Sequence, residues 1–439
     1  MEECMVCREF LDLVRSNKQA GRPIGVFSIC SAHPIVLEAS MRHALSRKYL
    51  LVIEATSNQV NQFGGYTGMT PKGFVDYIKR LADRIGYPFD RILLGGDHLG
   101  PNLWKSETAD SAMQKACVMI EHYVHAGFRK IHLDASMYCS DDKGDVNKPL
   151  DDRIVATRAA KLCQVAERAW ENSGRIGEKP LYVVGTEVPI PGGMTTKHHV
   201  VEPTIPSAAL ETLRISQEVF VAHGLSEVWE RVVGLVVQPG VEFGDHEVVS
   251  YDPVKAKDLH AALASYDSIV CEAHSTDYQP LSALGSLVKD HCCILKVGPW
   301  LTFAYREALF ALESIEKELH RQYNFKRCSF LRENIERTML ENPGYWEGYY
   351  SKGPGLSFTL AYSYSDRIRY YWTHHTIEDS VRTLLHNLNS AVIPHSLLSQ
   401  FFPAEYVEVG EGSLEAKAET LVIRHIQRVL DTYTQACGW

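Results

Sequence analysis

The sequence has no uninterrupted apolar run of the ~18–20 residues that a membrane helix needs. It also has no block of lysine and arginine, and 45 basic against 54 acidic residues give a net charge of −9. We therefore expect no membrane span and no nucleic-acid binding through phosphate contacts. The first twenty residues have the pattern of a short amphipathic helix and lack the features of a signal peptide.

Paired cysteine motifs are scarce. Cys4 and Cys7 form a CxxC, but no second pair follows at the spacing of a zinc site, which favours a structural role for them. The eleven cysteines are an odd number scattered over expected strands and helices, as in a protein with free thiols in a reducing compartment. The expected location is the cytoplasm. With 45% apolar and 23% charged residues, the chain has the composition of a globular protein with a large core.

Short apolar runs alternate with longer amphipathic segments through the first three quarters of the chain. The runs span residues 25–30, 49–55, 91–95, 130–134, 181–186, 232–238, 268–273 and 292–297. Near-continuous apolar character is typical of parallel strands that are covered on both faces. Eight such strands, each followed by a helix, predict an α/β fold of the (β/α)8 TIM-barrel type. A doubly wound sheet is the alternative, but the first run leads into SICSAHP without a glycine-rich phosphate turn.

Helical patterns fill the gaps between the runs and dominate the last quarter. Thr70 before Pro71 and Asp252 before Pro253 mark two helix starts, and helical periodicity also covers 107–126, 151–172, 208–223 and 302–319. Further helices are expected at 334–347, 362–372, 376–388 and 415–436. We predict a barrel with an N-terminal helix over residues 1–325. Residues 326–439 are expected to form a helical C-terminal subdomain whose aromatic residues pack on the barrel or on another subunit.

Ionisable and amide side chains end almost every expected strand. Because active sites of TIM barrels lie at the carboxyl ends of the strands, these side chains are expected to share one mouth. They are Glu54, Asn58, Gln59, Asp97, His98, Asn102, Asp134, Ser136, Glu187, Gln238, Glu242, Glu272, His274, Asp277 and Lys296. A charged group at an apolar strand end costs free energy unless it is paired or binds a metal, so this many predict a ligand or catalytic site.

Histidines next to carboxylates suggest a divalent metal ion, either zinc or manganese. The expected ligands are His98, His274, Asp134 and Glu242. Each histidine could instead be a hydrogen-bonded core residue. The candidate proton-transfer groups are Asp97, Glu54, Glu187 and Glu272.

A phosphate group is expected at glycine-rich turns and helix starts near the mouth. One such place is Gly64–Gly65, and the other is Gly298 leading into Thr302, at the usual phosphate position of this architecture. The other expected substrate-binding residues are Asn58, Gln59, Asn102, Ser136, Gln238 and Lys296. Lys296 is expected to neutralise carboxylates or contact a phosphate. A Schiff-base role is disfavoured because neighbouring acids keep its pKa high.

Long motifs of the chain resemble the GatZ/KbaZ family, the second subunit of class II D-tagatose-1,6-bisphosphate aldolase. They include residues 30–37 (CSAHPIVL), 95–102 (GGDHLGPN), 130–136 (KIHLDAS), 185–189 (GTEVP), 237–243 (VQPGVEF), 272–279 (EAHSTDYQ) and 362–372 (YSYSDRIRYYW). The resemblance covers essentially the whole chain. It implies a TIM barrel, a ketose phosphate ligand such as tagatose 6-phosphate or tagatose 1,6-bisphosphate, and an oligomer with a catalytic class II aldolase subunit.

The resemblance also implies roles for single residues. In catalytic relatives an Asp-His pair ending strand three supplies the proton-transfer acid and a metal ligand, and Asp97-His98 looks similar. His274 stands where those enzymes have another metal-binding histidine, whereas their third histidine, on strand six, has no counterpart beside Gln238 and Glu242. The implied function is therefore an accessory subunit, required for the activity and stability of the catalytic subunit in galactitol or N-acetylgalactosamine catabolism. The alternative is a metal-dependent 4-epimerase that converts D-tagatose 6-phosphate to fructose 6-phosphate, while a sugar kinase is disfavoured because no P-loop or kinase signature occurs.

Overall fold

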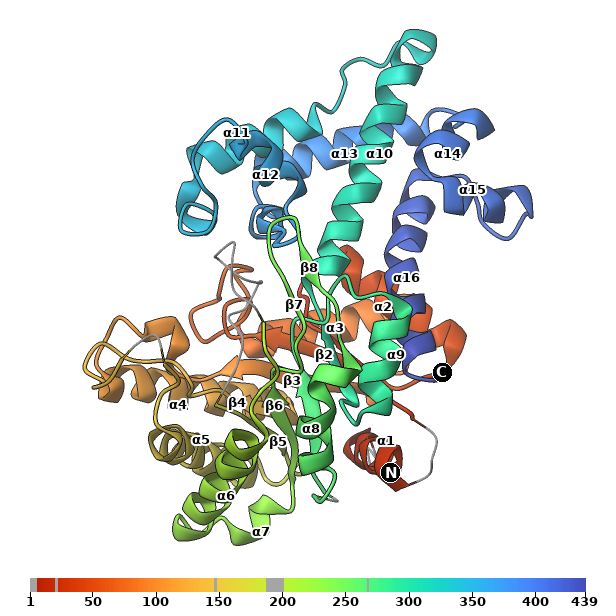
Figure 1. Ribbon diagram of the computed structural model, residues 1–439. Coiled ribbons are helices and arrows are strands. Elements are labelled where there is room, and N and C mark those ends of the chain that lie inside the picture. Colours follow the sequence, from red (N-terminus) through yellow and green to blue (C-terminus); the bar gives the residue numbers. More distant parts are fainter. Residues whose placement is uncertain (1–5, 20–22, 146–147, 187–200, 267) are drawn as a thin grey trace.

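Eight parallel strands close into a barrel in the order β1-β10-β9-β6-β5-β4-β3-β2 (Figure 1). The computed structural model describes residues 6–19, 23–145, 148–186, 201–266 and 268–439. The barrel strands are β1 (Val26–Ile29), β2 (Leu51–Thr56), β3 (Ile92–Leu99), β4 (Lys130–Leu133), β5 (Leu181–Val184), β6 (Val232–Val237), β9 (Val270–Ala273) and β10 (Ile294–Val297). Each lies within or overlaps a predicted apolar run, and the TIM-barrel prediction is confirmed.

Helices surround the barrel: most cover its outside, whereas Phe10 and Val14 of α1 (Val6–Gln19) pack with Val52 and Leu93 in a separate cluster. The helices are α1, α2 (Pro34–Arg47), α3 (Pro71–Ile85), α4 (Ala109–Ala126), α5 (Asp152–Asn172), α6 (Pro206–Ala222), α7 (Ser226–Trp229), α8 (Pro253–Leu263), α9 (Leu281–Lys289) and α10 (Pro299–Tyr323), with the 3-10 turns η1 (Phe89–Arg91) and η2 (Pro101–Trp104). The predicted caps are present, because Thr70 accepts a hydrogen bond from the N–H of Gly73 and Asp252 accepts one from that of Val254. A short antiparallel hairpin of β7 (Glu242–Phe243) and β8 (Val248–Val249) was not expected, since two-residue strands leave no periodic pattern.

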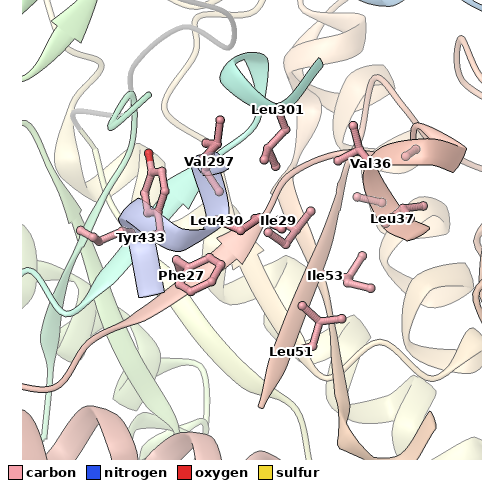
Figure 2. Packing of buried hydrophobic residues seen from close by; sticks show 14 of the residues in the cluster. Phe27, Ile29, Val36, Leu37, Leu51, Ile53, Val297, Leu301, Leu430 and Tyr433 are labelled. Carbon is pink, nitrogen blue, oxygen red and sulfur yellow. The ribbon is translucent and has the colours of Figure 1, made fainter. Parts of the chain in front are cut away.

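The C-terminal part is a cluster of helices at one end of the barrel (Figure 1). It contains α11 (Leu331–Glu341), η3 (Pro343–Tyr345), α12 (Leu356–Tyr362), η4 (Arg367–Tyr370), α13 (His375–Asn389), α14 (His395–Phe401), α15 (Pro403–Gly410) and α16 (Ala418–Ala436). The long helix α10 runs from the barrel into this cluster, and α16 returns to pack against α2, α9 and α10 (Figure 1). In the core, Leu430 and Tyr433 of α16 pack near Phe27 and Ile29 of β1 (Figure 2). The last helix thus shares the hydrophobic core of the barrel, and the division at residues 325 and 326 stays a prediction.

One predicted helix, over residues 362–372, is wrong. The structure replaces it with the end of α12, a turn and η4. Asp366 adopts a left-handed backbone with φ +46°, which a helix does not allow. The hydroxyl of Ser363 donates to Asp245 at 2.9 Å, and the N–H of Tyr364 donates to the carbonyl of Asp245 at 2.8 Å. Hydrogen bonds to the β7–β8 hairpin therefore determine the conformation of this segment, in place of the helix that its periodicity predicts.

None of the described helices combines the length and the apolar character of a segment that crosses a bilayer.

Candidate metal and substrate site

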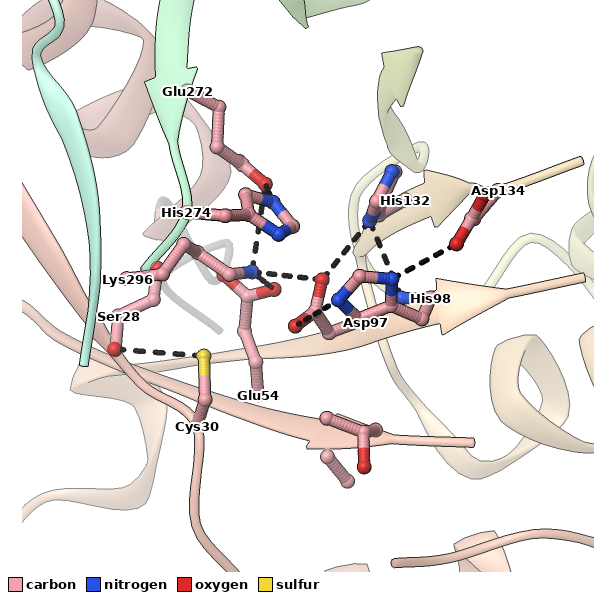
Figure 3. A network of polar contacts seen from close by, with 12 residues as sticks. Ser28, Cys30, Glu54, Asp97, His98, His132, Asp134, Glu272, His274 and Lys296 are labelled. Carbon is pink, nitrogen blue, oxygen red and sulfur yellow. Dashed lines mark hydrogen bonds and ion pairs between the residues drawn. The ribbon is translucent and has the colours of Figure 1, made fainter. Parts of the chain in front are cut away.

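Charged side chains from barrel strands meet inside the barrel. Lys130 Nζ of β4 lies 2.9 Å from Glu54 Oε1 of β2 and 2.6 Å from Glu272 Oε2 of β9. Lys296 Nζ of β10 lies 3.0 Å from Asp97 Oδ1 of β3 and 3.4 Å from Glu272 Oε1, and it also pairs with Glu54 (Figure 3). All five side chains are at most 5% exposed. Such burial is tolerated only because each charge has a close partner of opposite sign.

The charges of this cluster do not balance. Burial alone would raise the pKa of Asp97 and of Glu272, but the ammonium groups around them hold both pKa values well below the usual range. Burial alone would lower the pKa of Lys296, but Asp97, Glu272 and Glu54 raise it. Three carboxylates thus face two ammonium groups, and the excess of negative charge favours a further cation. A protonated Lys296 agrees with the expected neutralising role.

Three histidine rings adjoin this cluster. The ring centroids of His98, His132 and His274 lie 5.0–5.3 Å apart (Figure 3). His98 Nδ1 lies 2.8 Å from Asp134 Oδ2, and Ser136 donates a hydrogen bond of 2.7 Å to the other oxygen of Asp134. The Asp134 carboxylate therefore fixes the orientation of the His98 ring.

The other two rings are held in the same way. His132 Nδ1 lies 2.9 Å from Asp97 Oδ1, and His274 Nε2 lies 3.0 Å from Glu272 Oε1. Each of the three histidines thus has one ring nitrogen bonded to a carboxylate, which is the usual second contact of a metal-binding histidine. The other nitrogen of His132, Nε2, is buried and has no hydrogen-bond partner among the described residues. A buried imidazole nitrogen without a partner is costly unless it binds water or an ion.

The donor atoms fit a divalent metal ion. One ligand atom each from Asp97, His132, Glu272 and His274 lies within 4.8 Å of the others. Imidazole nitrogens with carboxylate oxygens suit zinc, manganese and related ions.

A cavity of about 240 Å³ opens above this cluster. Asp97, His98, His274 and Lys296 line it on the barrel side. Further lining residues include Asn58, Gln59, Tyr66, Asp277, Gly298, Thr302, Arg369, Tyr370 and Trp372. The cavity therefore lies between the mouth of the barrel and the C-terminal region.

A family model of the D-tagatose-1,6-bisphosphate aldolase subunit GatZ/KbaZ-like proteins matches residues 10–438. The chain belongs to the GatZ/KbaZ-like family. A crystal structure of a probable tagatose 6 phosphate kinase from Sinorhizobium meliloti 1021 is 45% identical with a TM-score of 0.85, over 94% of this chain and 100% of that one. More distant structures include the fructuronate-tagaturonate epimerase UxaE from Cohnella laeviribosi, at 12% identity and a TM-score of 0.46 over 94% of this chain and 81% of that one. The YdjI aldolase from Escherichia coli K12 is 10% identical with a TM-score of 0.40, over 85% and 96% of the two chains. Likenesses as distant as these two say nothing about function.

The predicted metal ligands have different positions in this GatZ/KbaZ-like protein. His98 and His274 lie in the histidine group, whereas Asp134 hydrogen-bonds to Nδ1 of His98. Glu242 lies on β7, where one of its oxygens accepts a hydrogen bond from the N–H of Phe243, and burial raises its pKa to about 7. Of the predicted proton-transfer groups, Asp97 lines the cavity, Glu54 and Glu272 lie in the charged cluster, and Glu187 lies outside the described residues.

Sequence reasoning missed His132. The signal was present in the fourth apolar run, where Lys130 and His132 stand two residues apart and therefore on the same face of the strand. Two polar residues at this spacing inside a buried strand point into the barrel together. The third histidine of the group thus lies on strand four, whereas the family resemblance leads one to expect it on strand six.

The predicted phosphate-binding groups at the start of α10 already have partners. The N–H groups of Gly298 and Trp300 both donate to Asp277 Oδ1 at 2.9 Å, and the hydroxyl of Thr302 donates to Asp366. Burial raises the pKa of Asp277 to about 6, although these hydrogen bonds oppose the shift. A carboxylate of the protein itself therefore lies where the architecture often places a phosphate.

The remaining predicted residues shape the mouth from outside the cavity wall. Gly65 has φ +56°, and a Cβ there would lie 2.3 Å from the carbonyl oxygen of Gln59, so this turn after Gly64 requires glycine. The same turn carries Tyr66 to the cavity. Gln238 accepts hydrogen bonds from the N–H groups of Gly240 and Val241 after β6. Asn102 lies in η2, and Ser136 acts on Asp134 as described above.

Proposed function

We propose that this protein is a metal-dependent 4-epimerase of ketose 6-phosphates, which interconverts D-tagatose 6-phosphate and D-fructose 6-phosphate. The observation that carries the proposal is the group of three histidines, each with one nitrogen bonded to a carboxylate, of which His98 and His274 line the cavity. The family match supports a tagatose phosphate as the substrate. The name of the 45% identical relative, a probable tagatose 6 phosphate kinase, agrees with a substrate of this class.

His132 and His274 would hold the ion, because their ligand atoms belong to the group that lies within 4.8 Å, and the ring of His98 adjoins both at 5.0–5.2 Å. The bound ion would supply Lewis-acid polarisation of the C2 carbonyl of the substrate. Glu54 and Glu272 touch no cavity wall and instead hold Lys130 and Lys296 in place.

Asp97 is the proton carrier in this proposal, because its carboxylate lines the cavity and is held ionised by Lys296. It takes the proton of the C4 hydroxyl while the O–H electrons form the C4 carbonyl and the C3–C4 electrons pass to an enediolate of C2 and C3. The aldehyde fragment then turns, and C3 attacks the other face of C4. Asp97 returns the proton to the C4 oxygen, so that C4 is inverted and no other reactant is consumed. The ammonium of Lys296 stabilises the negative charge that develops during cleavage.

The test is an incubation of the purified, chelator-treated protein with tagatose 6-phosphate, with and without added Mn²⁺ or Zn²⁺. We expect fructose 6-phosphate to form only with metal. His132→Ala is expected to abolish the reaction, whereas His125→Ala, an exposed histidine of α4, leaves it unchanged. The absence of fructose 6-phosphate after hours of incubation with either metal would refute the proposal.

A second candidate function is that of an accessory subunit for a catalytic class II tagatose-bisphosphate aldolase. It is favoured by the match of residues 10–438 to a family of aldolase subunits. Co-expression with a catalytic subunit of this class is expected to raise the activity and solubility of that subunit. If both stay unchanged, this candidate fails.

A further inference from the structure

The cavity has a second end, which the C-terminal region supplies. Arg369 and Tyr370 of η4 line it together with Tyr66 from the loop after β2. The rings of Tyr66 and Tyr370 lie 4.7 Å apart, and Tyr345 stacks on Tyr370 at 4.8 Å. These contacts fix the aromatic wall around the guanidinium of Arg369.

The hydrogen bonds of Arg369 leave one edge of its guanidinium available. Nη1 donates to the carbonyl oxygens of Ser365 and Asp366, and Nη2 donates to the hydroxyl of Tyr370 at 3.1 Å. A guanidinium has five N–H donors, so one N–H of Nη2 and the N–H of Nε are left over. No described residue accepts a hydrogen bond from either. Nε and Nη2 form the edge with which arginine binds two phosphate oxygens at once.

The charge around Arg369 also favours an anion. No carboxylate of the described residues lies within ion-pair distance of Arg369, and the same holds for the neighbouring buried Arg306 and Arg367. Arg367 stacks 3.1 Å above the ring centroid of Tyr349, and Arg306 lies 3.9 Å from that of Phe303. Two buried acids lie near them. Asp366 accepts the hydroxyl of Thr302, and Asp277, which lines the cavity, accepts two backbone N–H groups at the start of α10. This end of the cavity therefore carries an excess of positive charge, in contrast to the barrel end.

We propose that Arg369, assisted by Tyr66, binds the phosphate group of the sugar phosphate. The C-terminal region thereby sets how the substrate lies in the cavity, with the phosphate at Arg369 and the sugar carbonyl at the histidines. In the epimerase reaction it also retains the aldehyde fragment, which carries the phosphate, while the C4 carbonyl turns. The identity of the sugar rests on the proposed function, but the anion site does not.

The first experiment uses inorganic phosphate as the probe and the chelator-treated full-length protein, so that neither metal nor catalysis contributes. We expect Arg369→Met to weaken phosphate binding in a calorimetric or ³¹P NMR titration by about 10- to 100-fold, and Arg369→Lys by less, since lysine keeps the charge but not the two-point contact. Arg382→Met is the matched control, because Arg382 is an exposed arginine of α13 paired only with Asp379. Unchanged phosphate binding in folded Arg369→Met overturns the inference.

Tyr66→Phe removes one hydroxyl without removing a charge and guards against a folding defect of the arginine variants. We expect it to weaken phosphate binding by about 10-fold or more, as the loss of one hydrogen bond to a charged group does. Equal binding by Tyr66→Phe and the native protein removes Tyr66 from the site.

The second experiment compares kcat/KM for tagatose 6-phosphate with kcat/KM for unphosphorylated tagatose. We expect Arg369→Met to reduce the ratio of the two by about 100-fold, mainly through KM for the phosphorylated sugar. An unchanged ratio contradicts the inference. If the native protein binds phosphate through Arg369 but epimerises neither sugar, the proposed function fails and the anion site stands.

Discussion

The two ends of the cavity carry opposite charge, and the protein builds them in different ways. At the barrel end, three carboxylates outnumber two ammonium groups, and every charge has a partner of opposite sign within 3.4 Å. Around the C-terminal end, three arginines lie against aromatic rings and outnumber two buried acids, Asp366 and Asp277. Paired charges on strands fix the positions of the side chains at the barrel end. An arginine that stacks on an aromatic ring needs no carboxylate partner, so its N–H donors stay available for a ligand.

The secondary structure that carries these side chains also differs between the two ends of the cavity. The barrel residues project from strands whose backbone ladders continue around the closed barrel, so their side chains have little freedom to move. Arg367 and Arg369 project from a four-residue 3-10 turn, and the segment just before this turn is attached by hydrogen bonds to the β7–β8 hairpin. A change at the barrel end should therefore affect chemistry and stability together, and a change at the other end should affect mainly binding.

The largest expected effect is that of His132→Ala. We expect kcat/KM for tagatose 6-phosphate to fall by about 10³-fold or more, because the histidine group loses a ligand whose orientation Asp97 fixes. Metal content per chain, measured by elemental analysis after dialysis, should fall in parallel. His125→Ala is the control and should match the native protein in both measurements.

Retention of full metal content by His132→Ala would show that the ion is held elsewhere. In that case the two ends of the cavity would still differ in charge. The metal-dependent chemistry proposed for the barrel end would no longer stand.

The second effect concerns stability. Lys296→Met leaves Lys130 as the ammonium partner of Glu54 and Glu272 and leaves Asp97 with its histidine contacts alone. We expect the free energy of unfolding to fall by about 3–5 kcal/mol, as when one partner of a buried ion pair is removed. Arg367→Met, at the other end, removes a cation over a ring and should cost about 1–2 kcal/mol. Urea unfolding measures both.

The control for both variants is Lys289→Met, at an exposed position of α9, with an expected change within about 0.5 kcal/mol. Equal losses in Lys296→Met and Arg367→Met would contradict the distinction between paired and stacked charges.

These two ends were not equally predictable from the sequence. The barrel strands follow from apolar runs, and helix starts such as Thr70 and Asp252 follow from local capping, because both depend on neighbours in the chain. Residues at strand ends could be named for the same reason. The pairing of carboxylates with ammonium groups depends on how the strands are staggered in the closed barrel. No local sequence pattern predicts this stagger.

Arg369 shows the limit more clearly. It lies in a segment whose periodicity predicts a helix, and a helix over 362–372 would have placed it differently. The turn that the structure shows instead depends on Asp245, which is 118 residues away from Ser363. A residue whose position is set by so distant a contact cannot be assigned to a site from pattern alone.

A smaller effect is expected where the C-terminal region is attached to the hairpin. Ser363→Ala removes the 2.9 Å hydrogen bond to Asp245 Oδ1, and we expect a loss of about 1–1.5 kcal/mol in the free energy of unfolding. Because Arg369 follows in the same segment, KM for tagatose 6-phosphate should rise while kcat changes little. Ser399→Ala, at an exposed serine of α14, is the control. A change in kcat without a change in KM would indicate that this attachment acts on the barrel end instead.

The smallest effect comes from a charge cluster outside both ends of the cavity, which is partly exposed to solvent. His425 of α16 lies between Glu405 and Glu307, at 3.1 and 3.6 Å, with 27% of its side chain exposed. Burial alone would lower the pKa of His425, but its contacts with Glu307 and Glu405 outweigh burial and raise the pKa to about 9. The protonated histidine therefore stabilises the fold fully below its ordinary pKa of 6.5, and this contribution is lost as the pH rises through 9.

The burial of Glu405 would raise its pKa, but His425 and Arg428 lower it to about 2, so Glu405 stays ionised over this range. Between pH 6.5 and 9.5 the free energy of unfolding of the native protein should fall by about 1 kcal/mol more than that of His425→Gln, a modest value because solvent screens the pair. Urea unfolding at the two pH values measures the difference. Parallel behaviour of the two proteins would mean that the Glu405–His425 contact contributes nothing measurable, and that charge balance affects the stability of this protein only where water is excluded.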